Sequence, residues 1–110
     1  MGDRRNVIIK DGDDDVGVAL YTHWAGTELP DTLRESMKRG KGRWDDAPYL
    51  ARIIFCDMVS GSLKDETGYG LSAGNRLCEG SERDITLDVA QQQIQLGEGE
   101  KWQSFSDFAR

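Results

Sequence analysis

The side chains best suited to nucleophilic catalysis or metal binding are scarce in this chain: one histidine, His23, and two cysteines, Cys56 and Cys78. A cysteine nucleophile works with a nearby base, which is often histidine. Nothing in the sequence places either cysteine beside His23, and one histidine with two separated cysteines does not complete a four-ligand zinc site. We therefore predict no catalytic group, no metal and no cofactor, and we expect both thiols to be free.

Acidic residues cluster at positions 11–15, where three aspartates occupy the first, third and fifth positions of an EF-hand calcium loop. The rest of that loop does not fit. Val16 stands where the loop needs glycine, and Thr22 stands where a bidentate glutamate should close it. We interpret the run as the solvated tip of a hairpin, because charge runs usually face solvent.

Glycines at positions 68, 70 and 74 have a spacing similar to that of a dinucleotide-binding loop. Such a loop follows a buried strand and opens a helix within a βαβ unit. Here we expect a hairpin-like region instead of a helix. The glycines are better explained by turns or a bulge, so no nucleotide site is predicted.

A basic segment at residues 38–44, KRGKGRW, is the one local reversal of the overall acidity. Its cations and tryptophan could hold a phosphate or stack on a base. They could equally neutralise the end of a preceding helix and pair with the aspartates at 45 and 46. Residues 28–59 carry six cations and six anions, whereas the whole chain has a net charge of −6. Nucleic-acid-binding domains are usually basic, so we favour a structural or protein-docking role over direct nucleic-acid binding.

Apolar periodicity predicts strands at residues 7–9, 16–24, 68–73, 85–89 and 93–96. A helix over residues 28–39 should begin at a Thr27 cap, with Pro30 in its first turn. A second helix, capped by Asp45 or Asp46 and ending before Gly61, is apolar around most of its circumference. We expect that helix to be central to the domain.

A short helix over residues 102–108 should close the core with its three aromatic residues, Trp102, Phe105 and Phe108. The resulting order is ββααβββα. It indicates an α+β fold, an antiparallel sheet of four to five strands with two central helices on one face. The length of 110 residues fits a single domain, residues 1–110.

Neither a membrane anchor nor an export signal is expected. The apolar stretches fall short of the ~20 residues that a membrane-spanning helix needs. The first residues, MGDRRNVII, lack the apolar region of a signal peptide. We therefore expect a cytoplasmic protein.

Two stretches carry a family resemblance: LYTHWAGTELP at residues 20–30 and GRWDDAPYLARIIFCDMV at residues 42–59. The segment TGYGLS at 67–72 and the strand at 85–89 extend it over most of the chain. The sequence resembles a family of small bacterial and bacteriophage proteins without an assigned activity. The resemblance implies a bacterial or phage origin and brings no catalytic residue with it.

These observations favour a non-enzymatic acidic protein that binds a protein partner. By analogy with small acidic phage proteins, one version is an inhibitor of a host or defence factor, such as an anti-CRISPR protein or a nucleic-acid mimic. Surplus negative charge would steer a basic partner toward it. The residues expected in the partner surface are Arg39, Lys41, Arg43, Trp44, Asp13, Asp14 and Asp15.

Two other functions stay open. A small enzyme or ligand-binding domain would place its site around His23, Trp24, Arg43 and Asp45. That site requires a strand end, a loop and a helix start to meet at one edge of the sheet. The other function is a purely structural or self-associating module, and the sequence leaves the oligomeric state open.

Overall fold

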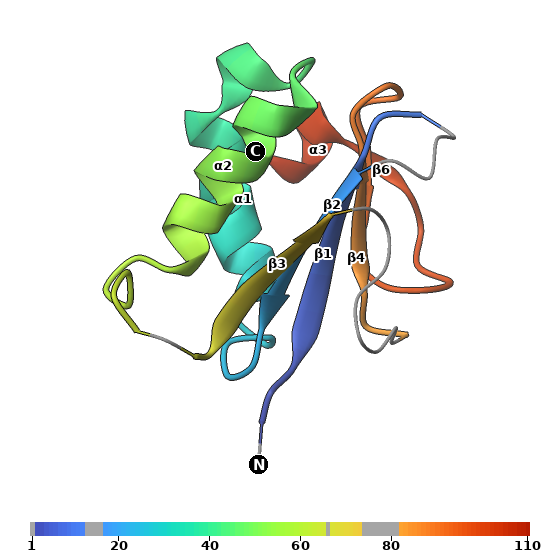
Figure 1. Ribbon diagram of the computed structural model, residues 1–110. Helices are drawn as coiled ribbons and strands as arrows, with labels where there is room; N and C mark the ends of the chain where they lie inside the picture. Colours follow the sequence, from blue (N-terminus) through green and yellow to red (C-terminus); the bar gives the residue numbers. More distant parts are fainter. Residues whose placement is uncertain (1, 13–16, 66, 74–81) are drawn as a thin grey trace.

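The computed structural model describes residues 2–12, 17–65, 67–73 and 82–110. They form one sheet with the two longer helices on one of its faces (Figure 1). The elements in chain order are β1 (Arg5–Lys10), β2 (Gly17–Thr22), α1 (Leu29–Arg39), the 3-10 turn η1 (Lys41–Arg43), α2 (Ala47–Met58), β3 (Tyr69–Ala73), β4 (Ile85–Asp88), β5 (Gln93–Gln95), β6 (Gln103–Ser104) and α3 (Phe105–Phe108).

The six strands lie in the order β3-β2-β1-β4-β5-β6. β1 pairs antiparallel with β2 and parallel with β4, and the other ladders are antiparallel. Val7 therefore faces Leu20 on one side and Ile85 on the other, all three of them buried. The central strands thus present one apolar face to the helices.

The α+β class is confirmed, with a pair of helices between two groups of strands. The predicted antiparallel sheet of four to five strands is wrong, because the sheet has six strands and one ladder is parallel. Side chains alternate in the same way in both strand directions, so periodicity does not report the direction of β4. The predicted order ββααβββα lacks β6, whose two residues are too short to show a period.

The two longer helices begin at different kinds of cap. Asp46 caps α2 as predicted, accepting the Tyr49 backbone N–H at 3.3 Å. Pro30 lies in the first turn of α1 as predicted, but the predicted Thr27 cap is wrong. α1 begins after Glu28 without a side-chain cap, and Thr27 donates its backbone N–H to Asp3 instead. Neither these nor any other helix in the described ranges has the length and apolarity to cross a membrane.

The core lies between the sheet and the helical pair. α2 contributes one buried stripe that includes Leu50 and Ile54, both fully buried, whereas Tyr49 is 53% exposed and Cys56 is also exposed. The apolar circumference of α2 therefore does not make it the centre of the domain; it covers the sheet with one face. The largest fully buried side chains are Ile9, Leu20, Leu29, Leu33, Met37, Leu50, Ile54, Ile85, Leu87, Ile94, Phe105 and Phe108.

The C-terminal segment closes the core as predicted, although its helix is shorter. α3 begins at Phe105 because the Ser104 hydroxyl accepts the Asp107 backbone N–H and caps it. Phe105 and Phe108 are buried, which confirms two of the three predicted aromatic contacts. Trp102 lies outside the helix and is 41% exposed, so its expected place in the core was wrong.

Truncating the buried stripe of α2 tests this core. Ile54→Ala should lower the free energy of unfolding by about 2–5 kcal/mol, because it leaves a cavity where the side chain was fully buried. The neighbouring Ile53 is only half-buried, so Ile53→Ala should cost less than half as much. Urea unfolding of both variants measures the difference, and equal losses would contradict the burial of this stripe.

Candidate functional site

The residues predicted to form one ligand site lie at opposite ends of the molecule. His23 and Trp24 follow β2, at the end where α1 begins, whereas Arg43 and Asp45 follow α1. α1 has 11 residues, which separates its two ends by about 16 Å at 1.5 Å per residue. Figure 1 shows the same arrangement, with the connection between α1 and α2 far from the N-terminal end of β1. The enzyme or ligand site that needed all four residues is therefore not assembled.

Arg39, predicted to contact a partner, pairs with a carboxylate of the same chain, although 56% of its side chain stays exposed. Its guanidinium lies 2.6 Å from the Asp57 carboxylate, which also accepts the Ser36 hydroxyl at 2.5 Å. This bridge joins the last turn of α1 to the last turn of α2. It borders an open depression between the two helices, lined by Thr32, Glu35, Lys38, Arg39, Asp57 and Ser60.

Trp44 is not the exposed stacking residue that the basic segment suggested. It is half-buried, and its ring meets Phe105 at a centroid distance of 5.8 Å. The indole N–H donates to the Met37 carbonyl at 2.9 Å. The last carbonyls of a helix lack partners within the helix, so Trp44 satisfies one of them while fixing the turn between α1 and α2.

Lys41, Arg43 and Asp45 stay at the surface. The Arg43 guanidinium stacks 4.7 Å from the centroid of the Tyr49 ring and lies 3.8 Å from Asp46. Part of the basic loop is thus still available to a partner, and Tyr49 joins it. The acidic run Asp13, Asp14 and Asp15 lies outside the described residues, and so does Cys78.

The most prominent exposed side chain at the other end is Trp24, with 60% of its surface exposed. Its ring meets His23 edge-on at a centroid distance of 4.9 Å. The His23 Nδ1 in turn shares a 2.8 Å hydrogen bond with the Tyr21 hydroxyl. We call Tyr21, His23, Trp24 and Gly68 the Trp24 cluster.

Gly68 lies directly against the Trp24 indole ring. Its carbonyl accepts the His23 backbone N–H at 2.8 Å, which places the first residue before β3 beside the end of β2. The backbone of Gly68 has φ +99°, and a Cβ added there would overlap the six-membered ring of Trp24. Only glycine allows both this backbone and this close approach. The indole therefore rests directly on main chain.

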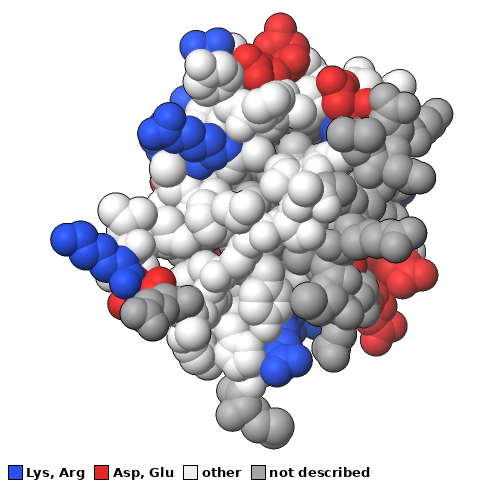
Figure 2. Space-filling view, viewed as in Figure 1, with Lys and Arg blue, Asp and Glu red and all other residues white. Residues whose placement is uncertain are grey.

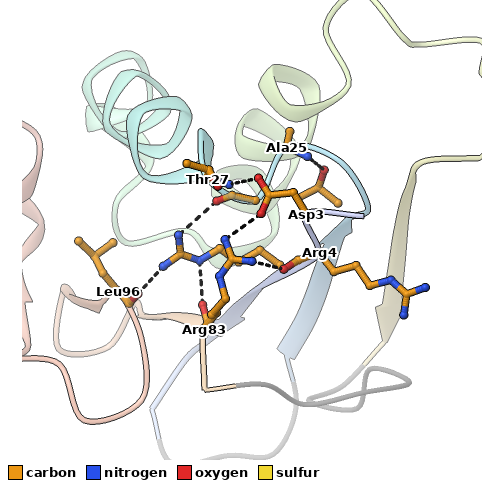
Figure 3. A network of polar contacts seen from close by, with 9 residues as sticks. Asp3, Arg4, Ala25, Thr27, Arg83 and Leu96 are labelled. Carbon is orange, nitrogen blue, oxygen red and sulfur yellow. Dashed lines mark hydrogen bonds and ion pairs between the residues drawn. The ribbon is translucent and has the colours of Figure 1, made fainter. Parts of the chain in front are cut away.

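The turn that carries Trp24 is fixed by the N-terminal segment (Figure 3). Asp3 donates its backbone N–H to the His23 carbonyl at 2.7 Å and accepts the Gly26 N–H at 2.8 Å. Its carboxylate accepts the Thr27 N–H at 2.7 Å. The Arg5 guanidinium adds a bond to the Gly26 carbonyl at 3.2 Å. Residues 23–27 are therefore bound at several points to the chain that enters β1.

Charge reinforces this anchor at Asp3. Hydrogen bonds from Thr27, assisted by the Arg83 guanidinium 3.0 Å away, lower the pKa of the Asp3 carboxyl from 3.8 to about 2. The carboxylate form is the one that accepts these bonds. The fold is therefore favoured by an ionised Asp3.

Some of the described acidic residues are paired with cations. Six ion pairs join Asp3, Asp31, Glu35, Asp46, Asp57 and Asp107 to arginine or lysine partners. Asp88, which is 8% exposed, accepts the backbone N–H groups of Gly12 and Gln91. A nucleic-acid mimic would present rows of unpaired carboxylates. Among the described residues, other carboxylates such as Glu28, Glu98 and Glu100 stay exposed.

The Trp24 cluster offers a flat apolar ring, a phenol and an imidazole. The free Cys56 lies on α2, in a different part of the fold. Nowhere in the described ranges do three or more histidine, cysteine or acidic side chains gather to hold a metal ion.

Comparisons with known proteins do not add a relative: no protein-family model matches the chain, and neither curated proteins nor solved structures give a significant match. The resemblance to a bacterial and bacteriophage family therefore stays a prediction.

Sequence reasoning found His23 and Trp24 but missed Tyr21 and Gly68. Tyr21 was assigned only to a strand, and Gly68 to the start of the strand at 68–73 and to a turn or bulge. Their role depends on the β2–β3 register, which sets Tyr21 opposite Gly70 and so places Gly68 beyond it, next to His23. The usable signal was the pair of alternating glycines, because glycine in an edge strand leaves room for an aromatic ring across the ladder.

Lowering the pH should release the Asp3 anchor. A carboxyl whose pKa falls on folding stabilises the fold above its unfolded pKa, and this contribution is lost as the pH falls through the folded value. Wild type should therefore lose stability between about pH 4 and pH 2 through Asp3, a loss that Asp3→Asn lacks. Chemical unfolding at several pH values measures it. Asp31→Asn, at an exposed i,i+3 pair, is the control, and identical pH profiles for wild type and Asp3→Asn would contradict the anchor.

Adding one methyl group at Gly68 should displace the Trp24 ring from its position against the main chain. Gly68→Ala combines a positive φ with overlap of the indole ring, so it should cost more than about 1 kcal/mol of stability and increase quenching of tryptophan fluorescence by acrylamide. The matched control is Gly70→Ala, where the nearest atom, Tyr21 Cδ2, is 4.0 Å away. If both variants behave alike, Gly68 does not seat the indole.

Proposed function

We propose that this chain is a non-enzymatic protein that binds a protein partner, and that the Trp24 cluster is the centre of the contact surface. The observation that carries the proposal is Trp24 itself, an indole that is 60% exposed yet fixed on Gly68 and His23. Tryptophan and tyrosine are enriched among the residues that dominate binding energy in protein interfaces.

Preorganisation supports this role. An interface loses free energy when side chains and loops must be ordered on binding. Here the turn is already held by Asp3 and Arg5, and the ring is held by main chain below it. A partner that covers Trp24 would gain its apolar burial at little ordering cost.

The charge of the chain favours a protein over a nucleic acid as the partner. The net charge of −6 repels a phosphate backbone. Within the basic segment, the Arg39 guanidinium is paired with the Asp57 carboxylate, and the Trp44 indole N–H donates to the Met37 carbonyl. Lys41 and Arg43 stay exposed at the opposite end, where they could contact a second part of a large partner. The narrower proposal, an inhibitor of a host or defence factor, rests on the family resemblance alone.

Capture of the partner with matched tryptophan variants tests the function. Immobilised wild-type chain is incubated with a lysate of the bacterium that carries the gene or serves as its host, and bound proteins are identified by mass spectrometry. Trp102→Ala, which removes a different exposed tryptophan, should retain the same specific protein, and Trp24→Ala should lose it.

The identified protein is then purified and titrated calorimetrically. Trp24→Ala should weaken its dissociation constant by at least about 30-fold, the effect of losing a dominant interface residue. A partner that binds wild type and Trp24→Ala equally would place the interface elsewhere. Recovery of no specific protein would count against the proposed function as a whole.

A further inference from the structure

The outer edge of β3 is a second surface, next to the Trp24 cluster, whose Gly68 directly precedes the strand. β3 is a terminal strand of the sheet, paired with β2. The His23 N–H donates to the carbonyl of Gly68, directly opposite it in the antiparallel register. Hydrogen-bonded and non-hydrogen-bonded pairs alternate along such a ladder. The backbone groups of the alternate residues Tyr69, Leu71 and Ala73 therefore point away from β2.

Within its own five residues, β3 lacks the usual protection of an edge strand. Natural edge strands carry charges, prolines or bulges that prevent pairing with another chain, whereas β3 reads YGLSA, without any of them. Leu71 lies opposite the buried Leu20, on the helix-covered face of the sheet, yet it is 64% exposed. α2 packs over β1 and β2. The apolar layer of the core thus continues to Leu71, beyond the cover of the helices.

The charges around this edge favour a second copy of the chain as its occupant. In Figure 2 the middle of the face in view shows no lysine, arginine, aspartate or glutamate among the described residues, whereas basic side chains appear over α2 and at the margins. A charged partner strand would find no ion pair on β3 itself. Two copies can meet at an uncharged strand in spite of a net charge of −6 each.

We propose that two copies of this chain pair antiparallel through β3, about a two-fold axis at Leu71. The outward-facing residues 69, 71 and 73 are centred on that position. The axis therefore sets Leu71 beside Leu71 of the second copy, and Tyr69 beside Ala73 of the second copy. Every outward backbone group of the three residues then finds a partner. Each exposed leucine is covered by its equivalent, as an isologous interface requires.

Analytical ultracentrifugation across a concentration series tests the dimer. Wild type should show a monomer–dimer equilibrium between about 1 µM and 1 mM, by mass action. Leu71→Lys should raise the dimer dissociation constant at least tenfold, because it sets two like charges opposite each other. Leu63, which is 79% exposed, supplies the control: Leu63→Lys should dimerise like wild type. Circular dichroism confirms that both variants are folded.

A single cysteine tests the register. In a hydrogen-bonded antiparallel pair the Cα atoms lie about 5.5 Å apart, within the range of about 4.4–6.8 Å that a disulfide spans. Leu71→Cys, with Cys56 and Cys78 replaced by serine, should form a cross-linked dimer under mild oxidation, and Leu63→Cys in the same background should not.

A wild-type chain that is monomeric at 1 mM would overturn the proposal, as would a dimer that persists unchanged in Leu71→Lys. Equal cross-linking of the two cysteine variants would also overturn it. Trp24→Ala should leave the dimer intact, so this proposal and the partner-binding function fail separately.

Discussion

The arrangement of loops at one end of this sheet depends on a single guanidinium. Arg5, the first residue of the central strand, donates to the carbonyls of Arg83, Gly26 and Leu96 at 2.8, 3.2 and 2.6 Å. These carbonyls belong to three connections that are far apart in the sequence. Burial lowers the pKa of the Arg5 guanidinium, but arginine stays protonated in proteins. A permanently charged guanidinium thus bonds three backbone carbonyls from separate loops. The Arg83–Asp3 ion pair lies beside it and extends the same network. Because Gly26 belongs to it, the position of Trp24 depends on the same cation.

How far the sequence predicts the structure differs between the fold and the site. Alternation located β1, β2 and β4, the proline and aspartate signals placed α1 and α2, and spacing identified Phe105 and Phe108 as core. The direction of β4 could not be predicted, because alternation is the same in parallel and antiparallel strands. Trp44 was misassigned because its indole N–H is used by the Met37 carbonyl, a contact that exists only once α1 has ended. The position of Gly68 beneath Trp24 depends on the β2–β3 register, for which the alternating glycines were the only local signal.

Several of the residues that first suggested chemistry make structural contacts, although Lys41 and Arg43 stay exposed. Cations near the end of α1 hold α2 or stack on Tyr49. Two exposed apolar side chains lie elsewhere: Trp24 beside Gly68, and Leu71 on an edge strand without charges. The strand β3 itself carries no charged residue, and charged side chains appear around it in Figure 2.

The position of Gly68 also bears on valency. It lies just before β3, three residues from Leu71, so in the proposed dimer two copies of it flank the shared strands. With a rise of about 3.3 Å per residue, the two copies of Gly68, and the indole rings against them, are about 20 Å apart along the strands. They would belong to one continuous sheet and could not move independently. A partner with two equivalent sites at that spacing would bind the second indole at a high effective concentration. Avidity would then select for partners that are themselves dimeric or repetitive.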